Sequence, residues 1–296
     1  MNIAIIAVNC FVFISGYFRI KVKVKGLLSL FLQIFFYSFL FTLVSYLLQF
    51  NVDIVVCVKR CLFPLTDSGM WFITAYIALY LFSPLINAGY ANLNSKERKI
   101  MLFFLLLVDV YIGYMHQSSE VSIDGYHLVH FIVLYYIGAY ISDLQKEYDS
   151  LKLFLFWIFI VFVMTLMHSI KMVFFPISIV YSLRYNSPMV MLASVVFFMW
   201  IRTLKIRSQL INTVSVSVLS VYIIQSQPIV DKYLWSFCKM LSDKYESFSE
   251  FFFILISLLL FYVLCVSFDK IRILICSPCV NRLSSTFENG FIKSIK

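Results

Sequence analysis

The chain has 296 residues, 62% of them hydrophobic and only 13% charged. Because soluble domains carry about 25% charged residues, this composition excludes a water-soluble fold and indicates a protein that lies in lipid. The net charge of +9 does not indicate nucleic-acid binding, since the lysines and arginines stand in short clusters between apolar runs, as they do in membrane proteins.

Apolar runs long enough to cross a bilayer recur along the whole chain. A spanning helix needs roughly 17–25 mostly apolar residues. The runs are rich in Leu, Phe and Ile and lack the alternation of an outer-membrane barrel. We therefore predict an all-α, polytopic transmembrane helical bundle with nine spans, at 1–18, 26–50, 71–89, 100–115, 126–142, 153–173, 188–204, 213–230 and 250–268. A single membrane domain is expected over 1–270, followed by a cytoplasmic C-terminal tail over 271–296.

Positive charge divides the connections between these spans into two sets. One set holds 17 of the 24 lysines and arginines, and the other holds 7. Since the connections richer in Lys and Arg stay in the cytoplasm, we expect the N-terminus outside and the C-terminus inside. The stretches 51–70 and 231–249 are then outer connections, and they are the two that fit this assignment least, since they carry two and three basic residues but also acids.

The spacing of the cysteines does not predict a metal site. Cys276 and Cys279 have the CxxC spacing, but no second pair completes a zinc site among the seven cysteines. We therefore expect no metal cofactor.

The first apolar run has its basic residues after it and none before it. A signal peptide has the opposite order, with a positive region first. An outward start with an immediate apolar run predicts that a further helix precedes this one in an active form.

Four stretches together carry a family resemblance. They are FVFISGYF in the first span, CLFPLTDSGMWFITAYIALYLFSPLIN at 61–87, FIVLYYIGAYI at 131–141 and VYIIQSQPIV at 221–230. In this order the chain resembles the acyltransferase-3 family of integral membrane acyltransferases, and most of all bacterial members that O-acetylate surface polysaccharides. The block at 61–87 is the most specific part of the likeness.

The resemblance implies a ten-helix bundle in the bacterial cytoplasmic (inner) membrane. Such a protein takes an acetyl group from cytoplasmic acetyl-CoA and delivers it to a sugar hydroxyl on a lipid-linked or exported glycan: O-antigen, capsule or exopolysaccharide. The family's first helix carries an Arg and a catalytic His, and neither has a match in this sequence. Where many relatives have Tyr-Leu-Ile-His, this chain ends the motif at Gln225.

Candidate cofactor-binding residues gather at the inner end of the first span. Acetyl-CoA carries phosphates, and the basic cluster that follows the span suits them. Gly16 would allow close backbone approach and expose N–H groups. The alternative is that the lysines only set topology or bind anionic lipid. The candidates are Ser15, Gly16, Lys21, Lys23 and Lys25.

Three residues are candidate catalytic groups. His127 and His130 are three positions apart and are expected on one helix face, where they would replace the missing base or simply meet headgroups and water. Asp109 is an ionisable residue within a span, which is costly and marks a functional candidate. It is expected either to face a water-filled groove or to pair with a Lys or Arg.

Candidate substrate-binding residues lie at the outer ends of two spans. Trp71 and Tyr76 would stack on a sugar, or form the interfacial aromatic belt. Gln225 and Gln227 would bind glycan hydroxyls, or satisfy backbone groups loosened by Pro228.

Three functions remain open from the sequence. The first is a membrane O-acetyltransferase. In that case this 296-residue chain is expected to show little or no acetyl transfer by itself. The second is a catalytically silent relative, and the third a carrier or polymerase for lipid-linked glycans. The outer connections carry at most one arginine each, which argues against a polymerase.

Overall fold

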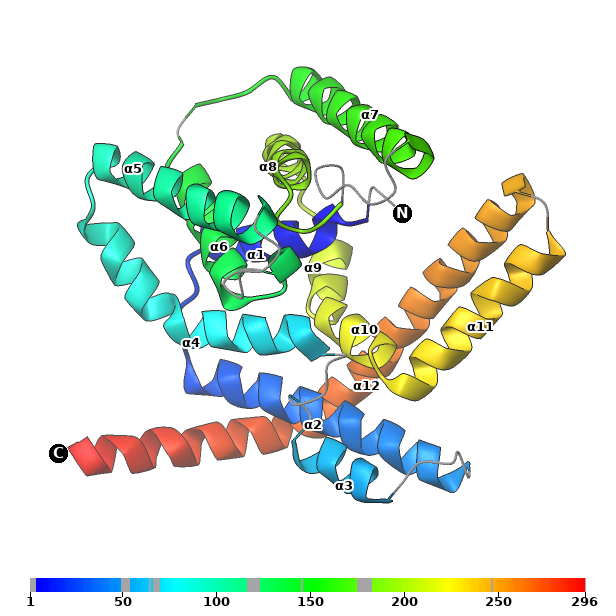
Figure 1. Ribbon diagram of the computed structural model, residues 1–296. Helices are drawn as coiled ribbons and strands as arrows, with labels where there is room; N and C mark the ends of the chain where they lie inside the picture. Colours follow the sequence, from blue (N-terminus) through cyan, green and yellow to red (C-terminus); the bar gives the residue numbers. More distant parts are fainter. Residues whose placement is uncertain are drawn as a thin grey trace. The chain divides into compact units, whose positions relative to one another are not determined.

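The computed structural model describes residues 4–48, 54–63, 65, 70–115, 123–144, 146–174, 183–245 and 247–295, and the regular elements in these ranges are all helices. Two compact units are formed, each from two separate parts of the chain (Figure 1). Unit 1 comprises residues 1–22 and 72–206, and unit 2 comprises residues 23–71 and 207–296.

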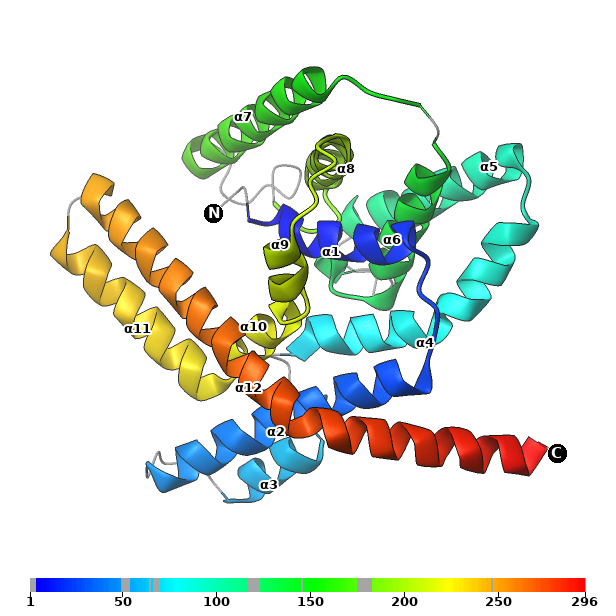
Figure 2. The ribbon, with the colours of Figure 1, turned by 180° about the vertical axis from the view of Figure 1, so that it is seen from behind.

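Unit 1 is built around the first helix of the chain. Its α-helices are joined by a π-helix, η3, and by a short 3-10 turn, η4. In chain order the elements are α1 (Ile6–Tyr17), α4 (Trp71–Asn92), α5 (Ser95–Leu106), η3 (Leu107–Met115), η4 (Ile123–Gly125), α6 (Leu128–Asp143), α7 (Ser150–Phe174) and α8 (Pro188–Thr203). Helix α1 packs against α6 and α8. In Figure 2 the blue α1 crosses this unit beside the green α6.

Two glycines allow α1 and α6 to approach closely. A Cβ atom on Gly16 would lie 2.0 Å from the carbonyl oxygen of Tyr135, and one on Gly138 would lie 2.3 Å from that of Phe13. Gly16 is buried by this contact. The prediction that Gly16 exposes backbone N–H groups is therefore wrong: the missing side chain serves helix packing, because α6 occupies the space that a ligand would need.

Helix α7 shows how this protein meets lipid. Its inner face packs on α8 through aromatic rings, with Trp157 and Trp200 stacked at 5.9 Å between ring centroids. Its outer face presents apolar side chains at helical spacing that are each about half exposed or more: Leu155, Phe159, Phe162 and Leu166. A bare apolar stripe of this kind is stable in hydrocarbon and not in water.

The predicted span at 100–115 is two elements of different helix type. Helix α5 begins earlier than predicted, at Ser95, after an Asn94 capping box in which the Glu97 side chain accepts from the Asn94 backbone. The polar first turn explains the early start, because capping residues favour a helix where hydropathy does not. From Leu107 the chain continues as the π-helix η3.

Unit 2 contains the remaining helices. They are α2 (Val24–Leu47), α3 (Ile54–Leu62), α9 (Gln209–Ser215), α10 (Val218–Gln225), α11 (Pro228–Lys244) and α12 (Ser247–Ile295). Helix α12 packs against α2, α10 and α11. The antiparallel pair α11 and α12 is visible in yellow and orange in Figure 1.

The predicted connection at 231–249 is wrong over most of its length. Helix α11 occupies Pro228–Lys244, and Pro228 takes the first helical position that proline favours. The pair formed by Gln209–Gln225 and Pro228–Lys244 is bent by 86° at the intervening break. The predicted span at 213–230 therefore comprises the end of α9, all of α10 and the sharp turn into α11.

Among the residues that the structure describes, four helices are long and apolar enough to cross a membrane, and a fifth span is counted if the bent pair is one. The four are Val24–Leu47, Trp71–Asn92, Ser150–Ile170 and Phe248–Thr286. Three more of the nine predicted spans are shorter apolar helices in the described ranges, namely α1, α6 and α8. The chain is a polytopic, helical membrane protein.

The expected C-terminal tail continues α12, which runs without interruption to Ile295. The domain boundary at residue 270 stays a prediction.

Candidate functional site

Three polar side chains meet inside unit 1. His130 Nδ1 lies 2.7 Å from Asp109 Oδ2, and His130 Nε2 lies 3.2 Å from Asn9 Oδ1. All three residues are completely buried. Buried polar groups are costly unless they are hydrogen-bonded, and a buried charge needs a partner, so these side chains stabilise one another.

The direction of each hydrogen bond follows from Asn9. Its side-chain N–H donates to the backbone carbonyl of Tyr185 at 3.0 Å, which leaves Oδ1 facing His130. An amide oxygen only accepts, so His130 carries a proton on Nε2. The contact between Nδ1 and Asp109 Oδ2 is the second hydrogen bond of the ring, so protein groups engage both ring nitrogens.

A tight turn closes this site against the His130 ring. Gly125 has a φ of +83°, and a Cβ atom there would lie 2.6 Å from Tyr185 Cβ and 3.1 Å from His130 Cδ2. Beside it the Tyr185 N–H donates to the Asp124 carbonyl at 3.2 Å. Arg184 and Asp124 form an ion pair at 2.6 Å. Only glycine combines this backbone conformation with so close an approach.

The π-helix places Asp109 in the site. A wider helical turn changes which side chains face inward, and such segments often occur at functional sites. The backbone carbonyl of Asp109 accepts a hydrogen bond from Asn186 Nδ2 at 3.3 Å. Asp109 is thus held through its backbone by Asn186 and through its side chain by His130.

Among the three catalytic candidates, the structure brings His130 and Asp109 together and leaves His127 apart. His127 is the N-cap residue of α6, lies before its first turn, and is exposed. The prediction that the two histidines share a helix face is wrong, because α6 begins one residue too late. Asp109 pairs with a histidine, where the sequence had suggested water, Lys or Arg.

Asn9 is the site residue that sequence reasoning missed. It stands within the predicted span 1–18 among apolar residues. An amide inside an apolar span needs a hydrogen-bond partner, and this signal was present in the sequence.

Ser15 and Tyr76 also lie close together. The Ser15 Oγ is 3.1 Å from the Tyr76 hydroxyl and donates to the Phe11 carbonyl at 3.2 Å. The Tyr76 ring stacks with Phe72 at 6.0 Å between centroids. A predicted cofactor-binding residue and a predicted substrate-binding residue are therefore neighbours. Trp71, which begins α4, is partly buried.

The three candidate lysines surround the N-terminus of α2. Lys21 precedes the helix, Lys23 is its N-cap residue, and Lys25 lies in its first turn. All three are exposed. The N-terminal end of a helix carries partial positive charge, so this segment is strongly electropositive and suited to an anion.

The two candidate glutamines differ in their environments. Gln225 is exposed, whereas Gln227 is buried and donates from Nε2 to the Ile223 carbonyl at 3.1 Å. Beside them Ser226 Oγ donates to the Tyr222 carbonyl at 2.8 Å. Gln227 and Ser226 thus satisfy carbonyls at the end of α10, where Pro228 breaks the hydrogen-bond ladder.

Asp143 is the centre of a second polar cluster in unit 1. Its carboxylate oxygens lie 2.5 Å from Arg19 Nη2 and 2.8 Å from Arg98 Nη1. The Tyr90 hydroxyl donates to the same carboxylate at 2.6 Å, and both guanidinium groups lie over the Tyr90 ring. This cluster ties the ends of α1, α4, α5 and α6 together.

A third polar cluster lies in unit 2 around Asp269. Its Oδ1 accepts from the Tyr37 hydroxyl at 2.8 Å and from Arg272 Nε at 2.6 Å. Nearby, Gln33 Nε2 donates to Ser220 Oγ at 2.5 Å. These contacts join α2, α10 and α12. Among the described residues no group of three or more His, Cys, Asp or Glu side chains is placed to hold a metal ion.

Comparison with known proteins places the chain in a family. The acyltransferase-3 model, described as an acyltransferase domain, matches residues 1–269, which is most of the chain. No curated protein and no solved structure gives a significant match. With its apolar spanning helices and this match, the chain belongs to the acyltransferase-3 family of membrane acyltransferases.

Proposed function

We propose that this protein is an O-acetyltransferase that moves an acetyl group from cytoplasmic acetyl-CoA to a sugar hydroxyl of a cell-surface polysaccharide. The observation that carries the proposal is the buried His130–Asp109 pair inside a member of an acyltransferase family. The acceptor is a lipid-linked or exported glycan, such as O-antigen, capsule or exopolysaccharide.

The chemistry requires a proton to move from the sugar to the thiol. The thioester C–S bond breaks, the new ester C–O bond forms, and the hydroxyl proton ends on the CoA sulfur. A histidine held at Nδ1 by a carboxylate can accept and return that proton at Nε2. In the structure Nε2 lies 3.2 Å from Asn9 Oδ1, so the sugar hydroxyl would have to take the place of the Asn9 oxygen at Nε2.

The exposed lysines at the N-terminus of α2 are the proposed contact for the CoA phosphates. Lys21, Lys23 and Lys25 supply full charges, and the helix terminus adds its partial charge and N–H donors. Ser15 and Gly16 belong to the proposed donor side as the last turn of α1. Because Gly16 is covered by α6, its part in this proposal is to position α1.

Aromatic and amide groups are the proposed contacts for the acceptor, each considered within its own unit. Tyr76 offers a hydroxyl beside Ser15, and Trp71 offers a ring face for a sugar. Gln225 has a free amide at the end of α10, whereas Gln227 uses its N–H on the Ile223 carbonyl and retains its oxygen to accept from a sugar hydroxyl.

The charge distribution supports the proposed orientation. The basic residues at the α2 N-terminus belong to the richer set of connections, which supports a proposed topology with these residues and the C-terminus in the cytoplasm of a bacterial cell and the N-terminus outside its cytoplasmic membrane. Acetyl-CoA is then on the same side as the lysines.

One observation favours a second candidate function, a catalytically silent relative. Asn9, Asp109 and His130 have no exposed surface, and both ring nitrogens are engaged by protein groups. A structural polar cluster would have the same appearance. The two candidates differ in whether acetyl groups reach the glycan.

The experiment is transfer of radiolabelled acetate from acetyl-CoA in membranes that contain the protein and the glycan of its own host. We expect label in a base-labile ester on the glycan, dependent on the protein. Absence of label, with the protein present and inserted, would favour the silent relative. Movement of unacetylated lipid-linked glycan across the membrane would favour the carrier.

A further inference from the structure

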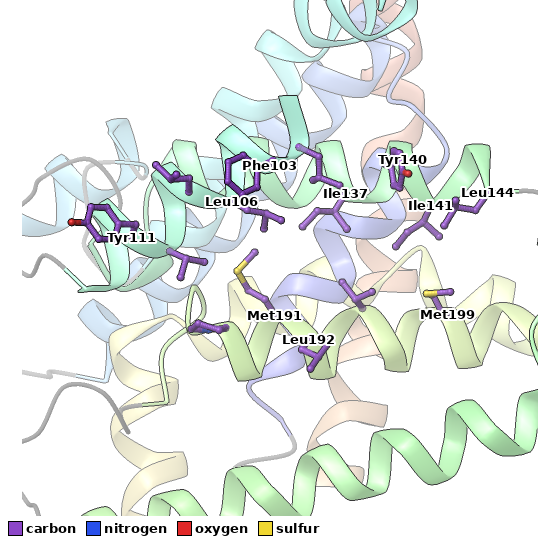
Figure 3. Close-up of a pocket in the computed structure, with 15 residues that line it drawn as sticks. Phe103, Leu106, Tyr111, Ile137, Tyr140, Ile141, Leu144, Met191, Leu192 and Met199 are labelled. Atoms are coloured by element: carbon purple, nitrogen blue, oxygen red, sulfur yellow. The ribbon is translucent and has the colours of Figure 1, made fainter. Parts of the chain in front are cut away.

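Unit 1 has an apolar groove along its side, between α5, η3, α6 and α8. Its volume is about 710 Å³, in the range of sites that hold small molecules. Figure 3 shows Leu106, Ile137 and Met191 along its length, with Tyr111 at one end and Met199 near the other. The lining side chains are apolar except for two tyrosine hydroxyls.

The groove has the length of one leaflet of a bilayer. Its lining residues on α8 run from Pro188 to Met199, which at the helical rise is about 16 Å. Half of a hydrocarbon core of about 30 Å is about 15 Å. A single acyl chain that occupied the groove along α8 would therefore span about the thickness of one leaflet.

A cation stands at the Met199 end of the groove. Arg202 lies one turn beyond Met199 and donates to the carbonyls of Ile141 at 2.9 Å and Leu144 at 3.1 Å, both of which line the groove. It also donates to the Lys146 carbonyl at 3.3 Å.

The Ile141 and Leu144 carbonyls stand at the C-terminus of α6, whose partial negative charge offsets only part of the full charge of Arg202. No carboxylate pairs with this arginine in the described ranges of the chain. Its three bonds use both N–H groups of Nη2 and one of Nη1, so two of the five guanidinium donors still lack a protein acceptor. Lys205, three residues further on, adds an exposed charge.

We propose that this groove binds one acyl chain of an anionic phospholipid, with the lipid phosphate held by Arg202. An apolar groove about as long as one leaflet, ending at a guanidinium that has no carboxylate partner among the described residues, matches an amphiphile with a negative headgroup. A helix from a second copy would fill the groove but leave the arginine charge without a partner. The site does not include the His130–Asp109 pair, and the proposal does not depend on acetyl transfer.

The test is native mass spectrometry of the delipidated full chain in detergent, titrated with dioleoyl-phosphatidylglycerol and with dioleoyl-phosphatidylcholine. The two lipids share their acyl chains and differ in headgroup charge. We expect the wild-type protein to bind the phosphatidylglycerol about fivefold or more tightly than the phosphatidylcholine. Equal binding of the two, or a lipid-free dimer as the main species, would overturn the proposal.

Two pairs of variants separate the acyl site from the headgroup site. Val195→Trp fills the groove and should weaken phosphatidylglycerol binding about tenfold, whereas Leu155→Trp, on the exposed face of α7, should leave it unchanged. Arg202→Gln should remove the preference for phosphatidylglycerol, and Lys205→Gln should keep most of it. Wild-type lipid binding by Val195→Trp, or an unchanged preference in Arg202→Gln, would contradict the assignment.

Discussion

Asp109 Oδ2 lies 2.7 Å from Nδ1 of His130, in a part of unit 1 where neither side chain reaches the surface. The pair joins η3 to α6, and Asn9 joins it to α1. One hydrogen-bonded cluster therefore holds together three elements that are separate in the sequence. Loss of either member of the pair would leave the other buried without its partner.

We predict strong energetic coupling between these two residues. Asp109→Leu and His130→Leu should each lower the free energy of unfolding by about 1–3 kcal/mol, because each leaves a buried polar group without its hydrogen-bond partner. The double variant should cost clearly less than the sum. Unfolding of the purified protein in mixed micelles measures all three, and strict additivity would show that the contact contributes nothing.

The glycines give a second prediction with an internal control. Gly16→Ala should destabilise the protein by about 1–3 kcal/mol, because its Cβ would overlap the Tyr135 carbonyl and push α1 away from α6. Gly89→Ala has open space around its Cβ and should be neutral or stabilise α4 by about 0.5–1 kcal/mol. Melting temperatures in detergent compare the two. Equal effects would mean that the α1–α6 contact is looser than described.

The hydrogen bond to Asp269 in unit 2 gives a third stability prediction, again with a control variant on the same helix. Tyr37→Phe removes the hydroxyl that donates to the buried carboxylate and should cost about 1.5–3 kcal/mol. Tyr46→Phe on the same helix changes an exposed ring and should cost little. Urea or SDS titration of each variant reports the difference, and a neutral Tyr37→Phe would show that the hydroxyl is replaceable by water.

The lysines at the α2 N-terminus lead to a kinetic prediction. Replacing Lys21, Lys23 and Lys25 together by Gln should raise the KM for acetyl-CoA severalfold, since charge-assisted contacts to phosphates are lost. A matched triple replacement of Lys232, Lys239 and Lys244 on α11 removes the same charge from exposed positions and should leave KM unchanged. Equal KM values for the two variants, at equal protein levels, would reduce the first cluster to a topology signal.

Hydropathy predicted most of the helices correctly, because lipid imposes a strong requirement on composition. It failed at 231–249, where Asp231, Lys232 and Lys244 suggested a polar connection and the structure has helix α11. The proline at 228 was the better signal, since it favours the first turn of a helix as readily as it breaks the end of one.

The candidate site was only partly predictable. Asp109 and His130 were each identified as costly or titratable groups, but their pairing depends on the π-helix and on the turn at Gly125, which neither hydropathy nor helical spacing describes. The Asp143 and Asp269 clusters were missed for the same reason. The Asp269–Arg272 pair is at i,i+3 within α12 and was open to helical spacing, but the remaining contacts of both clusters join helices distant in the chain, about which periodicity within one helix carries no information.

The most direct test of a catalytic role for the His130–Asp109 pair compares two histidines on the same segment. His130→Gln removes the buried imidazole, whereas His127→Gln changes an exposed ring just before α6. If the His130–Asp109 pair is catalytic, His130→Gln lowers the rate of acetyl transfer from acetyl-CoA to the glycan by about 10²–10⁴-fold, at a protein level corrected for folding, and His127→Gln retains wild-type activity. Acetyl transfer at the wild-type rate by a folded His130→Gln protein would show that the pair is not catalytic.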